Sequence, residues 1–268
     1  MQQFNPLVSI ITPSLNQGQY IEHTILSVLN QSYNNLEYII MDGGSTDNTE
    51  MIINKYKHDK RLQCFYGKDG GQYDAINKGL KIASGQIIGY INSDDIYYPQ
   101  ALENAVENFR SKPNIDVLYG DYIFIDENNF IIPFKPFVRK FEKKWLMRYD
   151  FINPSATFIS SWVIKEGFFL NPGISHFGDW DWYLRMVQKD KIFYHLEKIT
   201  CYFRVHKNSK TLTMSRKKIR EQRLMISHRY NIDIRKMVLF DDVIFPWYSR
   251  FAKLIDILRK KTPTLAIK

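Results

Sequence analysis

The 268-residue sequence contains two cysteines and no long apolar run. Cys64 and Cys201 are too few for a disulfide framework or a four-cysteine zinc site, so we expect free thiols in a reducing cytosol. The most apolar stretch, Val238 to Leu258, is interrupted by five charged residues, and therefore does not predict a membrane-spanning helix. The first residues also lack the basic and apolar parts of a signal peptide, so we expect a cytoplasmic protein.

The common glycine-rich phosphate loops are missing as well. No G-x-G-x-x-G sequence follows Ile11 or Met41, and no G-K-[ST] occurs, which excludes a dinucleotide fingerprint and a P-loop. Although the net charge is +9, residues 1–206 hold 21 basic and 23 acidic side chains, whereas residues 207–268 hold 16 and 5. A near-neutral body with a basic end argues against nucleic acid as a partner.

Short apolar strands alternate with amphipathic helices through the first 110 residues. The predicted strands are residues 7–11, 36–41, 62–66 and 86–91, and apolar residues at helical spacing lie between and after them. Such alternation predicts an α/β fold, with a mixed, mostly parallel sheet and helices on both faces.

The second half of the chain is less regular. The elements predicted there are a strand over 117–125, a hairpin partner over 130–134, a helix from Asp179 and a strand over 200–205. From about Thr213 the pattern is helical and basic. The sequence therefore predicts a domain over residues 1–210 and a basic, amphipathic helical C-terminal extension over residues 211–268.

Polar residues gather after three of the predicted strands, at 12–16, 42–47 and 92–95. Ligands bind outside the carboxyl ends of the strands in open α/β sheets, so we expect one shared site there. Asp94 and Asp95 could ligate Mg²⁺ or Mn²⁺ together with a diphosphate, or could cap a turn. Asp42 could accept a hydrogen bond from a nucleotide base, or could cap the amides of its own turn.

Seven sequence motifs follow one another along the chain. They are VSIITPSLN at 8–16, SVLNQSY at 27–33, DGGSTDNT at 42–49, YDAINKG at 73–79, NSDD at 92–95, GDWD at 178–181 and YFRVH at 202–206. Their order resembles glycosyltransferase family 2, and in particular the glycosyltransferases of bacterial cell-surface polysaccharides. The resemblance implies a GT-A (Rossmann-like) fold, a nucleotide-diphosphate sugar donor, Mn²⁺ or Mg²⁺ as cofactor, a saccharide or lipid-linked saccharide acceptor, and inversion at the anomeric carbon.

The resemblance also implies roles for the matching residues. The donor-binding residues would be Thr12, Pro13, Ser14, Asn16, Asp42, Asp74, Lys78 and Asp94. Asp95 and His206 would bind the metal, although His206 could also be a surface histidine. Asp179 would be the catalytic base that deprotonates the acceptor hydroxyl.

Two positions depart from the pattern of the family. Gly178 stands where many members have Glu before the base, which leaves Asp181 as a competing base. Asn92 stands where many members have Asp. Two other functions use similar features: a nucleotidyltransferase, although residues 12–18 offer no Lys or Arg for its phosphate loop, and a non-catalytic, membrane-attached protein that binds nucleotide sugars.

Two basic segments remain. Residues 135–148 hold six basic residues and one acidic residue, and fit a solvated surface or a contact with an acceptor or a membrane. In the extension, basic residues accompany an apolar and aromatic stripe over 240–258. This extension could be a solvated helix face, could bind a partner subunit, or could attach to an anionic membrane. We expect the last, with the enzyme peripheral at the inner face of the cell membrane.

Overall fold

The computed structural model describes residues 4–213 and 215–233, and within them the strands form one mixed sheet. The strands are β1 Val8–Ser14, β2 Leu36–Asp42, β3 Leu62–Tyr66, β4 Ile87–Tyr90, β5 Ile96–Tyr97, β6 Val117–Ile125, β7 Thr157–Ser160 and β8 Phe193–Arg204. Their order across the sheet is β3-β2-β1-β4-β7-β6-β8-β5. The first four strands are parallel, β6 is parallel to β8, and β5 and β7 are antiparallel to their neighbours.

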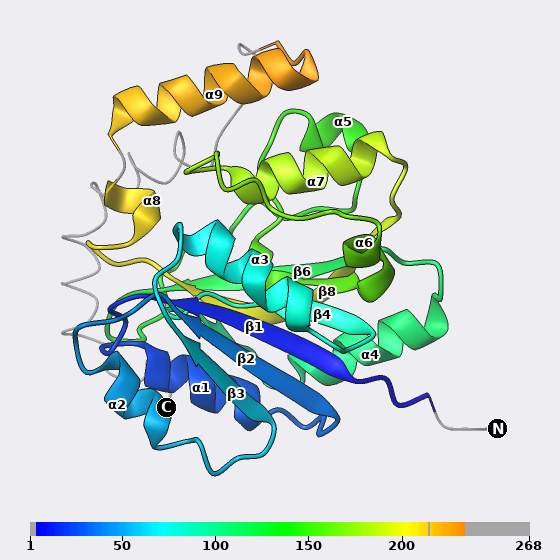
Figure 1. Ribbon diagram of the computed structural model, residues 1–268. Coiled ribbons are helices and arrows are strands. Elements are labelled where there is room, and N and C mark those ends of the chain that lie inside the picture. The colour runs from blue at the N-terminus through cyan, green and yellow to red at the C-terminus, as the bar shows by residue number, and fades with distance from the viewer. Residues whose placement is uncertain (1–3, 214, 234–268) are drawn as a thin grey trace.

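Helices cover both faces of this sheet (Figure 1). They are α1 Ile21–Leu29, α2 Thr49–Asn54, α3 Gln72–Ile82, α4 Ala101–Ser111, α5 Lys143–Leu146, α6 Ser161–Lys165, α7 Gly178–Gln188, α8 Lys210–Thr213 and α9 Arg216–Tyr230, with a 3-10 turn, η1, at Pro154–Ala156. Side chains of a strand alternate between the two faces. Val8 and Ile10 of β1 therefore join the core with α1, α2 and α4, whereas Ile11 joins the core with α3, α6, α7 and α9.

The α/β alternation predicted for the first 110 residues is confirmed. β3 has the predicted bounds, while β1 and β2 continue to Ser14 and Asp42, past the predicted ends. The extra length of β1 arises because Pro13 and Ser14 stay extended and pair with Met41 and Asp42 of β2. The first polar cluster therefore begins inside a strand, which holds its backbone in place.

The second half of the chain differs more from the prediction. The hairpin predicted over 130–134 forms only in part. Ile131 makes one antiparallel bridge with Ile125, and the Ile132 amide donates to the Phe124 oxygen at 2.8 Å, but the segment does not continue as a strand. The sequence does not predict β5 or β7, which are too short to show a period of two. It also misses the first half of β8, where exposed and buried residues do not alternate regularly.

The predicted helical region at the C-terminal end begins as expected, with α8 and α9. Ile219, Ile226 and Tyr230 of α9 are buried in the core that α7 also joins. Within residues 4–213 and 215–233, no helix is long and apolar enough to cross a membrane. The stripe predicted over 240–258 lies outside the described residues.

Candidate active site

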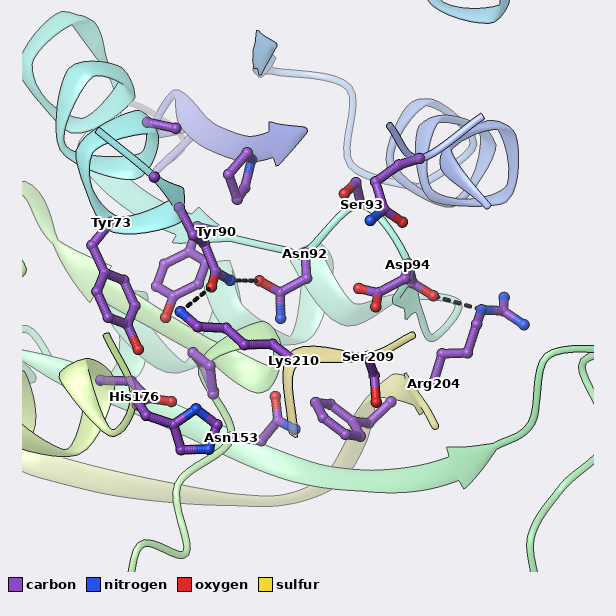
Figure 2. Close-up of a pocket in the computed structure, with 18 of the residues that line it drawn as sticks. Tyr73, Tyr90, Asn92, Ser93, Asp94, Asn153, His176, Arg204, Ser209 and Lys210 are labelled. Atoms are coloured by element: carbon purple, nitrogen blue, oxygen red, sulfur yellow. Dashed lines mark hydrogen bonds between the residues drawn. The ribbon is translucent and has the colours of Figure 1, made fainter. Parts of the chain in front are cut away.

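A cavity of about 490 Å³ opens at the carboxyl ends of β1 and β4 (Figure 2). Its walls come mainly from residues 13–17, 69–75, 90–94, 150–154, 176–179 and 203–213. The cavity therefore lies where the strand ends predicted a ligand site. Its volume is that of a typical small-molecule pocket.

The cavity brings together some of the predicted site residues and not others. Those that line it are Pro13, Ser14, Asp94, Asp179 and His206. Those that do not are Thr12, Asn16, Asp42, Asp74, Lys78 and Asp95. The side chains of the second group instead form hydrogen bonds and ion pairs with other parts of the chain.

Thr12 and Asp42 are buried and bond to neighbouring elements. The Thr12 hydroxyl lies 3.1 Å from the hydroxyl of Tyr38 on β2. Asp42 Oδ1 accepts hydrogen bonds from the amides of Gly44 and Ser45 at 3.0 and 2.7 Å, and Oδ2 accepts one from the Ser45 hydroxyl. Of the two roles that the sequence allows for Asp42, these contacts favour the turn cap.

Asn16, Asp74 and Lys78 hold loops near the cavity. Asn16 Oδ1 accepts a hydrogen bond from the Thr46 amide at 2.8 Å, which ties the end of β1 to the loop after β2. Asp74 and Lys78 form an ion pair of 3.0 Å on α3, and Asp74 also accepts a hydrogen bond from the Gly70 amide. Asp74 therefore fixes the glycine loop that precedes α3 and lines the cavity.

Asp95 lies behind the cavity wall. Its Oδ2 accepts hydrogen bonds from Ser155 Oγ at 2.6 Å and Asn92 Nδ2 at 3.1 Å, and its Oδ1 accepts one from the Arg204 amide at 2.9 Å. Burial, and next the charge of Asp94, raise the pKa of this carboxyl. Both oxygens are used in joining three segments of the chain, which argues against the predicted role of Asp95 as a metal ligand.

Asp94 is the carboxylate that faces the cavity. Its Oδ2 lies 3.0 Å from Nε2 of His206, which is 112 positions later in the chain. The backbone oxygen of Asp94 accepts a hydrogen bond of 2.7 Å from Nε of Arg204 (Figure 2). The fold therefore pairs the NSDD motif with the YFRVH motif at one wall of the cavity.

Several polar atoms on this wall lack a hydrogen-bond partner within the described residues. They are Ser14 Oγ, Arg204 Nη2, His206 Nδ1 and Ser209 Oγ, and each belongs to a buried side chain that lines the cavity. Buried polar atoms are nearly always paired, because leaving one unpaired costs about 1–3 kcal/mol. The cluster is therefore suited to a polar, hydrogen-bonding ligand.

Asp179 lies in the first turn of α7, three residues after His176, which Figure 2 shows across Lys210 from Asp94. Its side chain is partly exposed and lines the cavity. Burial in the wall raises its pKa, whereas the nearby charges of His176 and Lys210 lower it. A carboxylate with a raised pKa accepts a proton more readily, as a general base should.

Gly178 has no room for a side chain. A Cβ atom at this position would lie 2.3 Å from Cε2 of Tyr73. The Tyr73 hydroxyl in turn accepts a hydrogen bond of 3.0 Å from the Gly178 amide. Tyr73 thus occupies the space that a side chain at position 178 would need.

Asp181, the competing base, faces away from the cavity. It is fully buried, and its oxygens contact Arg185 Nε at 2.9 Å, Arg229 Nη1 at 2.6 Å and the Tyr230 hydroxyl at 2.7 Å. Because Asp181 does not line the cavity, it cannot reach an acceptor bound there. The geometry therefore favours Asp179 as the candidate base.

The sequence did not single out Lys210, which reaches across the middle of the cavity (Figure 2). Its Nζ donates a hydrogen bond of 3.1 Å to Gln72 Oε1 and lies 4.5 Å from the centre of the Tyr73 ring. Burial lowers the pKa of Lys210, while Asp179 raises it. Its position four residues after His206 could have indicated a place in the site. The predicted domain, however, ends at Lys210 itself.

A ready-made metal site is absent from the part of the chain that the structure describes. No group of three or more His, Cys, Asp or Glu side chains there could hold an ion. Asp94 and His206 offer two ligands, an oxygen and a nitrogen, so a cation would need further oxygens from a bound diphosphate.

The sequence of this chain matches a known family over most of its sheet. Residues 9–170 match the sequence model of Glycosyl transferase family 2, which is more than half of the chain. The chain belongs to this family. It is therefore a glycosyltransferase that depends on a nucleotide-sugar donor, and the alternatives of a nucleotidyltransferase and a non-catalytic binding protein fall away.

Relatives of this family 2 glycosyltransferase include both short and long proteins. An uncharacterized glycosyltransferase of Rickettsia typhi is 28% identical over 217 residues, which are 78% of this chain and 67% of the relative. Chondroitin synthase of Pasteurella multocida is 33% identical over 202 residues, which are 75% of this chain and 20% of that protein. The chain thus spans about a fifth of the synthase.

Solved structures confirm the GT-A-like fold. A 1–349 fragment of S. aureus TarS, determined in complex with UDP-GlcNAc, superposes with a TM-score of 0.69 at 19% identity, covering 82% of this chain and 65% of that one. The mannosyltransferase PcManGT of Pyrobaculum calidifontis, in complex with GDP-Man and Mn²⁺, gives a TM-score of 0.67 at 15% identity, covering 86% and 66%.

Proposed function

We propose that this enzyme moves a sugar from a nucleotide-diphosphate donor to a hydroxyl of a saccharide or lipid-linked saccharide, with inversion at the anomeric carbon. The observation that carries the proposal is the layout of the cavity. Asp179 lies near Lys210, while Asp94, Arg204 and His206 contact one another at the wall formed by the NSDD and YFRVH motifs. Similarity to a chondroitin synthase supports a role in the synthesis of a surface polysaccharide.

Asp179 is the proposed base. An acceptor hydroxyl is a poor nucleophile at neutral pH, and a positioned carboxylate that takes its proton contributes on the order of 10²–10⁴-fold in rate. If the acceptor lies against Asp179 and the diphosphate against the opposite wall, attack occurs from the face opposite the leaving group. That geometry inverts the anomeric centre.

The diphosphate is assigned to the wall with unpaired polar atoms. Arg204 and Ser209 line the cavity, and their Nη2 and Oγ atoms are buried donors without partners in the described chain. Lys210 Nζ adds a cation elsewhere in the cavity, next to Gln72 and Tyr73 (Figure 2). Donors that meet the charge developing on the leaving diphosphate lower the barrier most, because they are already oriented before the reaction.

Asp94 and His206 are the proposed metal ligands, in place of the pair Asp95 and His206. A bound Mn²⁺ or Mg²⁺ would neutralise part of the charge of the leaving diphosphate. The two side chains lie 3.0 Å apart at the cavity wall, and donor oxygens would complete the coordination. Calorimetric titration with UDP-GlcNAc, with and without Mn²⁺, should show metal-dependent binding that Asp94→Asn removes; equal metal dependence in that variant would contradict the assignment.

The remaining predicted donor residues keep supporting roles in this proposal. Pro13 and Ser14 line the cavity directly. Thr12, Asn16, Asp42 and Asp74 act through the loops that they hold, and Lys78 acts through its ion pair with Asp74.

A place at the inner face of the cell membrane fits the distribution of charge. α5 and α9 both contact α7, through the bond from Trp180 Nε1 to the Leu146 oxygen and through the ion pair of Arg229 with Asp181. Figure 1 shows both helices on the same side of the sheet. Exposed basic residues on them, such as Lys144 and Lys217, would meet anionic lipids there.

The base is tested by Asp179→Asn. We expect turnover to fall on the order of 10²–10⁴-fold, while calorimetry shows near-normal donor binding, because the amide cannot take a proton but has the same shape. Since the pKa of Asp179 is raised in the free protein, the acid limb of kcat/KM in the parent enzyme should lie above the usual range of an aspartate. Unchanged turnover in the variant would refute the proposed base.

A further inference from the structure

The first turn of α7 is held from behind by the C-terminal helix α9. Asp181 Oδ1 lies 2.6 Å from Arg229 Nη1 and 2.7 Å from the Tyr230 hydroxyl, which also lies 3.1 Å from the Asp181 backbone oxygen. Asp181 Oδ2 accepts a hydrogen bond of 2.9 Å from Arg185, one turn along α7. Two of the three partners of this carboxylate thus come from α9.

Asp181 and Tyr230 are buried, whereas the Arg229 side chain reaches Asp181 from the surface. Asp181 is fully buried, and a buried carboxylate without its partners is destabilised by several kcal/mol, because it has lost its water. The pKa of Tyr230 is raised by burial and then by Asp181, so its hydroxyl remains protonated and can donate. Detaching α9 would remove Arg229 and Tyr230 from Asp181 and leave its hydrogen bond with Arg185.

Asp181 and Asp179 share one helical turn. They are two residues apart, so their side chains point about 200° apart around the axis. Asp179 faces the cavity and Asp181 faces α9. A rotation of α7 that moved Asp181 would therefore move Asp179 by a similar angle, and in front the same turn is fixed by the bond from the Gly178 amide to Tyr73.

We propose that Arg229 and Tyr230 are positioning residues for sugar transfer, which hold the first turn of α7 so that Asp179 presents its carboxylate to the cavity. The catalytic unit then extends at least to α9, beyond the boundary predicted at residue 210. This inference rests on the proposed role of Asp179 as the base.

The first part of the test measures Asp179 directly and does not depend on the identity of the donor. Full-length protein labelled with ¹³C-aspartate is titrated by NMR, and the Asp179 carboxyl resonance is assigned by its loss in Asp179→Asn. The ionisable groups around Asp179 include His176, Lys210, the hydroxyls of Tyr73, Tyr90 and Tyr183, and Asp150, which lines the same cavity and acts on the same tyrosines. All of them stay in the variants below.

The decisive variants are Arg229→Gln and Tyr230→Phe. Each should lower the pKa of Asp179 toward its usual value, because the loosened turn exposes the carboxylate to water. Each should also lower the kcat of UDP-GlcNAc hydrolysis, measured with Mn²⁺, on the order of tenfold, with donor affinity within about twofold. Tyr230→Phe removes a single hydroxyl, so it keeps the test valid if Arg229→Gln fails to fold.

Two controls separate positioning from general stability. Arg229→Lys restores a cation that can reach Asp181 and should recover most of both effects. Arg220→Gln changes an exposed arginine of the same helix and should leave the pKa of Asp179 unchanged. An Asp179 titration that is the same in the parent, Arg229→Gln and Tyr230→Phe proteins overturns the inference, whereas full turnover in Asp179→Asn overturns the proposed base instead.

Discussion

At the scale of single residues, the site depends on a pair that no single-sequence pattern reveals. Gly178 and Tyr73 are 105 positions apart in the chain, yet the ring of one fills the space beside the backbone of the other. Tyr73 also lies under Lys210. One aromatic ring therefore sets the place of the proposed base and of the cation that faces the donor.

Gly178→Ala tests this pair. The added Cβ would lie 2.3 Å from the Tyr73 ring, so we expect a loss of roughly 1–3 kcal/mol in the free energy of unfolding, measured by denaturant titration. Gly70→Ala is a matched control, since its nearest atom beyond its chain neighbours would be 3.5 Å away. In a Tyr73→Ala background the extra loss from Gly178→Ala should largely disappear, and a fully additive loss would contradict the steric explanation.

At the scale of elements, two of the shortest elements place residues of the candidate site. α8 has four residues, yet it carries Lys210 into the cavity. β5 has two residues, and its antiparallel pairing with β8 helps to hold the turn of Asp94 against the segment that leads to His206. Elements of this length have no detectable period, so sequence patterns describe the scaffold better than the segments that close the site.

Two lysines, Lys78 and Lys210, are candidates for the cation that contacts the diphosphate. The sequence predicts Lys78, whereas the structure brings Lys210 into the cavity and pairs Lys78 with Asp74 outside it. We expect Lys210→Ala to lower kcat/KM by about 10²–10³-fold, in the range of a removed transition-state donor, and Lys78→Ala to change it little. Steady-state kinetics of both variants decide between them, and the reverse order of effects would restore the role predicted for Lys78.

At the scale of the whole molecule, the fold was largely readable from the sequence. The alternation of strands and helices predicted the parallel half and the edge where the cavity opens, because both follow from local periodicity. The residues that form the cavity wall were harder to predict. Asp95 and Asp181 look as reactive as Asp94 and Asp179 in the sequence, and only their burial and partners set them apart.

The basic side of the molecule, with α5 and α9, makes a prediction about membranes. Replacing Lys217, Lys218 and Arg220 with Gln should weaken binding of the full chain to phosphatidylserine vesicles by roughly 100-fold at low salt, at about 1 kcal/mol per residue. Co-sedimentation measures this. The control replaces Lys55, Lys57 and Lys60, which are exposed at the end of α2 on the other face of the sheet. Equal losses in the two variants would contradict a specific membrane face.

The cavity is assembled from two successive parts of the chain, and this has a consequence for exchange between relatives. The family match ends at residue 170, before Asp179, His206 and Lys210. A chimera that takes residues 1–170 from another member would therefore combine that member's strand ends, including its counterpart of Asp94, with this chain's own proton acceptor and its Arg204, His206 and Lys210. Because Tyr73 and Gly178 pack against each other across this junction, such a chimera should keep the cavity only if the incoming segment also supplies the tyrosine.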